Sequence, residues 1–244
     1  MIPVCMISIG CWMGSVFAES AAMVATVTQK SIDQGQPPAW WSANPPDTIC
    51  QDIQQRVSRW LDPLALPANQ YALCQEKLLE HYQRVWAWHQ EVDAMLDEAW
   101  LEWDRARTEK ENHPKDELEA LTIMHEKIDP LYATFTPQIH GLLLALKAEV
   151  GEEVTYSILD RITRSPGAQR TYRAYLEMIP EMTESERSVI WSRMVLAREE
   201  SLAAWQEKRI IKIFKKHKVR NEFSIDGFGY DYRARYQAWA KSLK

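Results

Sequence analysis

Tyrosines and arginines are interleaved between residues 156 and 178, in a pattern that could bind sugars. The rings of Tyr172 and Tyr175 could stack on a sugar, and the guanidinium group of Arg161 could hydrogen-bond to carboxylates or hydroxyls. Tyr156 begins the same segment. A second interpretation stays open, because Tyr172 and Tyr175 are three residues apart and could lie on the buried stripe of a helix, with their hydroxyls bonded internally.

A basic run near the C-terminus is the second candidate for binding chemistry. Lys216, Lys218 and Arg220 precede a glycine-containing turn that carries Tyr230 and Asp231. A run of charges is commonly a solvated face, but a neighbouring aromatic turn favours an anion site. The net charge is −5, yet residues 201–244 hold eleven Lys and Arg against four Asp and Glu. This distribution predicts either a surface for polyanions or internal complementarity with the acidic remainder.

The sequence contains no complete catalytic or metal-binding signature. It has no G-x-S-x-G elbow, phosphate-binding glycine loop, H-E-x-x-H or C-x-x-C motif. Its six histidines lack the spacing of metal ligands, so we expect no metal site and no cofactor. The 34 acidic residues offer too many candidates to single out a hydrolytic carboxylate pair. Should the chain be an enzyme, its candidates for proton transfer are Tyr156, Tyr172 and His217.

Residues 1–18 have the features of a secretory signal peptide. They contain no charged side chain and end in Val16-Phe17-Ala18, a small-x-small pattern that signal peptidase accepts. The apolar run is too short for a permanent membrane span. We therefore expect an exported, periplasmic or extracellular protein with no stable membrane insertion after signal removal. Cys50 and Cys74 would then share a compartment that permits disulfides, and the sequence leaves open whether they form one.

The rest of the chain predicts an all-α fold, an antiparallel multi-helix bundle or array behind a Pro-rich N-terminal arm (19–48). Glycine is scarce after residue 48, and strong helix formers dominate. Apolar positions step by three and four along residues 70–109, as one buried stripe should: Leu78, Tyr82, Val85, His89, Val92, Leu96, Ala99 and Trp103.

Local signals predict where the helices begin and end. Pro130 and Pro137 should kink or split a helix over 115–150, and Thr183 with Glu186 forms a capping-box pattern. We expect a single helical domain over residues 49–244. Its helices should cover residues 52–61, 70–109, 115–150, 152–178, 183–205, 207–218 and 232–242. The sequence leaves open whether the helix over 152–178 is interrupted at Ser165-Pro166-Gly167.

The sequence resembles a known family at the same two candidate segments. The matching motifs are Val154-Thr-Tyr156, Tyr172-Arg-Ala-Tyr-Leu-Glu-Met-Ile-Pro180, Met182-Thr-Glu-Ser-Glu186, Ala197-Arg-Glu199, Glu207-Lys208, Phe214-x-Lys-x-Lys218, Arg220 and Gly229-Tyr-Asp231. Together they resemble the domain-of-unknown-function 3826 family over residues 50–235. That family comprises exported helical proteins of polysaccharide-degrading bacteria, for which sugar binding is suggested and no reaction is established. The run Val219 to Ser224 departs from the family pattern and keeps only its Arg, so specificity could differ here.

These observations favour a carbohydrate-binding protein of polysaccharide utilisation, possessing a site for acidic oligosaccharides. Its binding residues would be Tyr156, Arg161, Tyr172, Tyr175, Lys216, Lys218, Arg220, Tyr230 and Asp231. Nucleic acid is not an expected partner, because the chain as a whole is acidic and carries an export signal. Two alternatives are a polysaccharide lyase or glycoside hydrolase, and a non-catalytic module that binds another protein.

Overall fold

The computed structural model describes residues 44–108, 116–163 and 167–243. Every regular element within these ranges is helical, which confirms the predicted all-α fold. The predicted signal peptide (1–18) lies outside the described residues, as does the predicted arm (19–48) up to residue 43. Among the described helices, none has an apolar stretch of the length that a membrane span requires.

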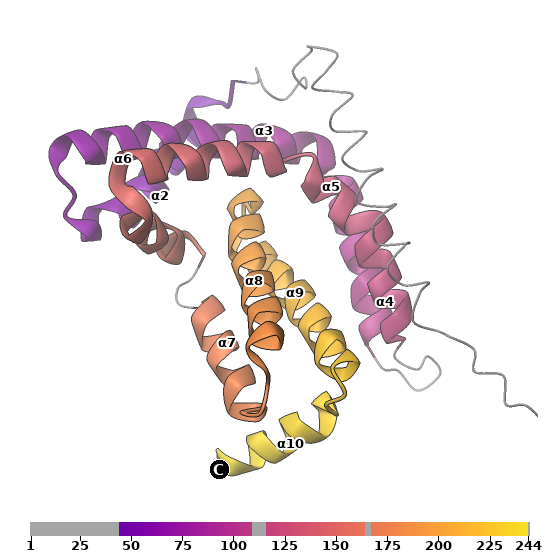
Figure 1. The fold of residues 1–244 in the computed structure, drawn as a ribbon. Helices are drawn as coiled ribbons and strands as arrows, with labels where there is room; N and C mark the ends of the chain where they lie inside the picture. Colours follow the sequence, from indigo (N-terminus) through magenta and orange to yellow (C-terminus); the bar gives the residue numbers. More distant parts are fainter. Residues whose placement is uncertain (1–43, 109–115, 164–166, 244) are drawn as a thin grey trace, which may run out of the picture.

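The helices follow one another with short connections (Figure 1). In chain order they are α2 (Asp47–Leu61), α3 (Ala68–Arg107), α4 (Glu117–Ile123), α5 (Asp129–Ala133), α6 (Thr136–Ile162), α7 (Gly167–Met178), α8 (Glu184–Glu200), α9 (Glu207–Gly227) and α10 (Tyr232–Ser242). Short 3₁₀ turns occupy Asp62–Leu64 and Ser201–Ala203, and Met124–Ile128 is a π-helical segment.

The first of two hydrophobic cores forms along α3, which at 40 residues is the longest described helix. All eight residues of the predicted stripe on this helix are buried, as the three-and-four spacing required. In Figure 1, α2 and α6 lie beside the first part of α3, and α4 and α5 lie beside its far end. The core includes three fully buried tryptophans, Trp88, Trp100 and Trp103. Burying side chains of this size contributes roughly 1.5–3 kcal/mol each, so α3 anchors the fold.

Proline and glycine set the breaks in the middle of the chain. The π-helical segment ends just before Pro130, and a two-residue turn at residues 134–135 precedes Pro137. Proline has no amide hydrogen to donate to the preceding turn, so the regular hydrogen-bond ladder is interrupted there. Gly151 has φ 78° and ψ 173°, so α6 bends at the residue where the sequence predicts one helix to end and another to begin.

The second core joins α7, α8, the end of α9 and α10. The predicted capping box opens α8: the Thr183 hydroxyl accepts from the Glu186 amide at 3.3 Å, and the Glu186 carboxylate accepts from the Thr183 amide at 2.7 Å. Helix α9 runs to Gly227, so its predicted end near Lys218 was wrong. Burial of Val219 and Ile225 against neighbouring helices continues α9 beyond the basic run.

Cys50 and Cys74 are both free thiols, so they do not form the disulfide that the sequence left open. Cys74 is buried on α3, and Cys50 lies half-buried in the first turn of α2. Burial raises the pKa of the Cys74 thiol, so this side chain behaves as a small uncharged core residue.

Candidate functional site

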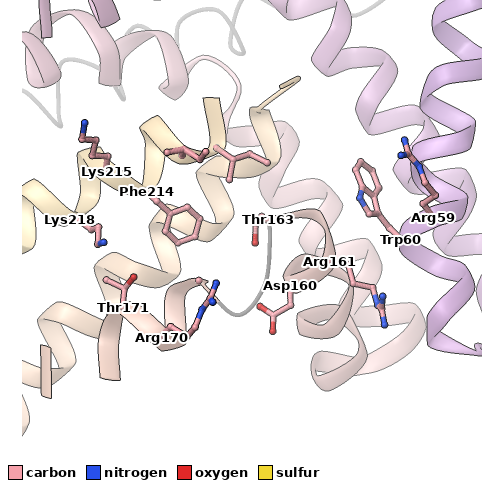
Figure 2. A pocket seen from close by; sticks show the side chains of 13 residues that line it. Arg59, Trp60, Asp160, Arg161, Thr163, Arg170, Thr171, Phe214, Lys215 and Lys218 are labelled. Carbon is pink, nitrogen blue, oxygen red and sulfur yellow. The ribbon is translucent and has the colours of Figure 1, made fainter. Parts of the chain in front are cut away.

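A groove of about 750 Å³ opens where the two cores meet. Figure 2 shows its walls: Arg59 and Trp60 come from α2, and Phe214, Lys215 and Lys218 come from α9 on the opposite side. The end of α6 and the start of α7 complete the lining through Asp160, Arg161, Thr163, Gly167, Arg170 and Thr171. The groove is therefore built from four helices, of which only α6 and α7 are consecutive in the sequence.

Helix ends explain how these side chains converge. Arg59 and Arg161 occupy the last turns of α2 and α6, where a cation is favourable beside the negative end of the helix dipole. Helix α7 begins at the groove with Gly167, so its positive end adds to the field there. A Cβ at Gly167 would stand 3.9 Å from the Phe214 ring, an ordinary van der Waals contact, so α7 passes near α9 at this point.

The groove carries an unbalanced positive charge. Five cationic side chains line it, namely Arg59, Arg161, Arg170, Lys215 and Lys218, and among the described residues none of them has a carboxylate within ion-pair distance. Of the residues that the structure describes, Asp160 is the only carboxylate in the lining, and it lies 3.7 Å from Arg198. Cations that no protein acid neutralises are available to an anionic ligand, and burial of a ligand between helices would strengthen the attraction.

The remaining basic residues of α9 contrast with those in the groove. Four of them point to the body of the protein and are neutralised there: Arg209 by Asp97, Lys212 by Asp104, Lys216 by Asp129 and Glu200, and Arg220 by Asp129. Lys208, in the first turn of α9, is exposed. The basic run thus has two faces. One face joins α9 to α3, α5 and α8, and Lys218 on the other face lies in the groove. Lys215 also lines the groove, and its Nζ lies 5.9 Å from the centre of the Trp103 ring of α3.

Two of the predicted binding residues, Lys216 and Arg220, belong to the neutralised face. Lys216 is 1 % exposed, and its Nζ donates to Asp129 Oδ1 at 2.9 Å and to Glu200. Arg220 donates to the second oxygen of Asp129. Burial raises the pKa of Asp129, but the charges of Lys216 and Arg220 outweigh it and lower that pKa to about 2. These groups hold helices together and lie outside the groove lining.

The predicted tyrosines also lie outside the groove lining. Tyr175 is buried and its hydroxyl donates to the Lys218 carbonyl at 3.4 Å, while Tyr172 packs on Trp191 with ring centroids 5.1 Å apart. The Tyr156 hydroxyl donates to Glu152 at 2.6 Å, and this bond raises the tyrosine pKa. The second interpretation, hydroxyls bonded internally, therefore fits Tyr175.

The C-terminal turn, residues 228–231, follows the end of α9 and precedes α10. Tyr230 donates to Glu186 Oε2 at 3.1 Å, and Asp231 caps α10 by accepting from the Ala234 amide at 2.9 Å. Of the residues predicted to bind ligand, the structure brings only Arg161 and Lys218 into the groove.

His217, a candidate for proton transfer, is buried with its Nε2 2.6 Å from Glu200 Oε2. Burial lowers the pKa of His217, and the Glu200 carboxylate opposes part of that effect. The side chain lies outside the groove lining, so its contacts are with the protein itself. No group of three or more His, Cys, Asp or Glu side chains in the described part of the chain is arranged to hold a metal ion.

Sequence reasoning missed Arg59, Trp60 and Phe214. Arg59 and Trp60 look like ordinary amphipathic helix residues, and Phe214 entered only as the first residue of the motif Phe214-x-Lys-x-Lys218, with no binding role assigned to it. Their common role follows only from the docking of α2 and α9 on either side of α6. The single available signal was the Arg-Trp pair at the end of α2, just before Pro63.

The fold and the groove define an all-α protein with a basic site between two helical cores. The chain belongs to the family described as Protein of unknown function (DUF3826), which it matches over residues 50–244. The match confirms the resemblance drawn from its motifs and extends it to the C-terminus. No match was found among curated proteins.

Proposed function

We propose that the protein binds an anionic carbohydrate in the groove between α2, α6, α7 and α9. The observation that carries the proposal is the set of five cations that have no carboxylate partner in the described protein. Guanidinium and ammonium groups bind the carboxylates and sulfates of acidic sugars through charge-assisted hydrogen bonds. The volume of about 750 Å³ falls in the range of small-ligand sites.

Two aromatic rings favour a sugar over a simple inorganic anion. Trp60 and Phe214 line opposite walls of the groove and present apolar surface to its interior. The C–H faces of a sugar ring stack on such rings, whereas a small anion gains nothing from them. The export predicted from residues 1–18 also supports a carbohydrate, since acidic polysaccharides are common polyanions outside the cytoplasm.

The lining favours binding over hydrolysis. Glycoside hydrolysis ordinarily needs two carboxyl groups across the scissile bond, and within residues 44–108, 116–163 and 167–243 Asp160 is the only carboxylate that lines this groove. Tyr156, Tyr172 and His217, which could transfer protons by their chemical type, lie outside the lining. We therefore expect the groove to hold its ligand unchanged.

The test is isothermal titration of the full chain with uronic-acid and sulfated oligosaccharides, with neutral oligosaccharides as the ligand control. Arg170→Gln and Lys218→Gln should each weaken binding roughly tenfold, because a hydrogen bond to a charged group contributes about 1.5–3 kcal/mol. Arg233→Gln, which removes one exposed charge from α10 outside the groove, should leave affinity unchanged. Melting temperatures of the three variants check that each is folded.

Higher salt should weaken the interaction, since the groove is open to solvent. Two outcomes would overturn the proposal: no binding of any acidic sugar at millimolar concentration, or binding that Arg233→Gln weakens as much as Lys218→Gln does. Association with another protein that ignores sugars and weakens with salt would instead favour the interaction-module alternative.

A further inference from the structure

A second cavity of about 360 Å³ continues the groove. The two share Arg59, Trp60, Arg161 and Ile210 in their linings, so Trp60 stands at the junction. The second cavity extends from this junction to α3 and to the segment that follows α8. A ligand in the groove therefore has space to continue past Trp60.

Tyr82 of α3 lines the second cavity and carries a polar group with no partner. The side chain is 3 % exposed, and its hydroxyl is buried without a hydrogen bond to any described residue. A buried hydroxyl that loses its bonds to water without replacing them destabilises the protein. Nearly all buried polar groups are paired in native proteins, so an orphan beside a cavity indicates a group that a ligand can satisfy.

The surroundings keep Tyr82 in position as a hydrogen-bond donor. Its ring lies 5.0 Å from that of Trp60, centroid to centroid, at an interplanar angle of 46°. Burial raises the pKa of the Tyr82 hydroxyl well above its ordinary value of 10.0, so the hydroxyl keeps its proton at neutral pH. The aromatic pair thus combines a stacking ring at the junction with a protonated donor in the cavity.

The second cavity is less cationic than the groove. Arg56, which lines it, is already neutralised by Asp52 at 2.8 Å and donates to the Trp205 carbonyl at 2.8 Å. Glu207 adds a carboxylate to the same lining, whereas the groove holds three cations that the second cavity does not share. A second anionic group would gain little here, but a hydroxyl-bearing neutral sugar would find both donors and an acceptor.

We infer that the groove and the second cavity are two adjoining subsites for an acidic oligosaccharide, in which an anionic sugar occupies the groove, a neutral sugar occupies the second cavity, and the Tyr82 hydroxyl donates to an oxygen of the neutral sugar. The inference rests on the proposed function and adds the length and polarity of the ligand. Trp60 lies between the two units and can stack on either. Tyr82 determines specificity for the second unit, because its hydroxyl is satisfied only when that unit is present.

The experiment uses two probes, glucuronic acid and an aldobiouronic acid, in which glucuronic acid is linked to a neutral sugar. Both are titrated into the full wild-type chain and into Tyr82→Phe. The wild type should bind the disaccharide at least tenfold more tightly than the monosaccharide. Tyr82→Phe should lose roughly three- to tenfold in affinity for the disaccharide, the effect of one hydrogen bond, and nothing for the monosaccharide.

The melting temperature of the ligand-free chain is a second readout. Tyr82→Phe removes a hydroxyl that has no partner in the structure and retains the ring, so the variant should melt no lower than the wild type. A lower melting temperature would show that the hydroxyl has a partner inside the protein, which would overturn its role in binding.

The results separate the inference from the proposed function. If the wild type binds neither probe, the proposed function fails, and the inference fails with it. If the wild type binds both probes equally, or if Tyr82→Phe weakens both to the same degree, the two-subsite inference fails while binding of an acidic sugar in the groove stands.

Discussion

Asp129→Asn replaces one carboxylate oxygen by an NH2 group. It thereby removes the negative charge that neutralises two cations of α9. Asp129 begins α5, and its side chain is 28 % exposed. Its two oxygens accept from Lys216, at 2.9 Å, and from Arg220. Lys216 also contacts Glu200, so one buried ammonium group joins α5, α8 and α9. The substitution therefore tests the cluster that keeps Lys216 and Arg220 away from the groove.

The size of the effect follows from the pKa of Asp129. Burial raises this pKa, but Lys216 and Arg220 lower it further, from 3.8 to about 2. At 1.36 kcal/mol for each pKa unit, this shift stabilises the folded state by about 2 kcal/mol. Because the folded pKa is the lower one, this stabilisation is fully present above pH 3.8 and is lost as the pH falls through 2. About half of it should remain at pH 3.

Urea unfolding of the wild type and Asp129→Asn, from pH 7 down to the lowest pH at which both keep a folded baseline, measures the effect. The two free energies of unfolding should differ by about 2 kcal/mol or more at pH 7 and converge toward pH 2, where the wild-type carboxyl is protonated. Glu102→Gln is the matched control. It breaks a 2.6 Å pair with Lys127, which is 50 % exposed, and should cost under about 1 kcal/mol.

The reasoning would be refuted by an Asp129→Asn difference that stays constant between pH 7 and pH 3. It would also be refuted by a difference at pH 7 no larger than that of Glu102→Gln. Either result would mean that the charge of Asp129 does not stabilise the folded protein through Lys216 and Arg220.

Three further predictions concern two glycines, one helix cap and one buried histidine. Gly151→Ala should lower the free energy of unfolding in urea by about 1 kcal/mol, because φ is 78° there, whereas Gly141→Ala, a helical site with open space, should raise it by about 0.5–1 kcal/mol. Thr183→Ala should lower it by about 1 kcal/mol and the melting temperature by about 2–4 °C, through loss of the α8 cap. Burial lowers the pKa of His81 from 6.5 to about 4, so wild-type stability should fall as the pH drops from 6.5 to 4, and His81→Gln should reduce that loss in urea titrations at each pH.

Much of the secondary structure could be predicted because its signals are local. The buried stripe of α3 follows from apolar side chains that recur every three or four residues, and the start of α8 follows from two side chains, Thr183 and Glu186, within one turn. Gly151 marks the bend of α6 because glycine adopts a positive φ without the steric strain that other residues have there. The end of α9 was misplaced because its continuation depends on burial against other helices, which no local signal encodes.

The roles of the basic residues were decided by the tertiary structure. Lys216 and Lys218 belong to one run, but residues two positions apart on a helix point in nearly opposite directions, because each residue turns the helix by about 100°. Lys216 therefore faces Asp129, 87 residues away in the chain, and Lys218 faces the groove. The sequence shows that both are cations near aromatic residues. It cannot show which of them is neutralised.

The sequence by itself determined that this chain is helical, where most helices begin, and which family it belongs to. Each of these depends on residues that are close together in the chain or on motifs in a fixed order. The groove depends instead on how α2, α6, α7 and α9 dock, and that docking is set by complementary shapes and charges summed over two cores. Trp60 and Tyr82 acquire their proposed functions only through that packing, because their sequence neighbours are those of any amphipathic helix.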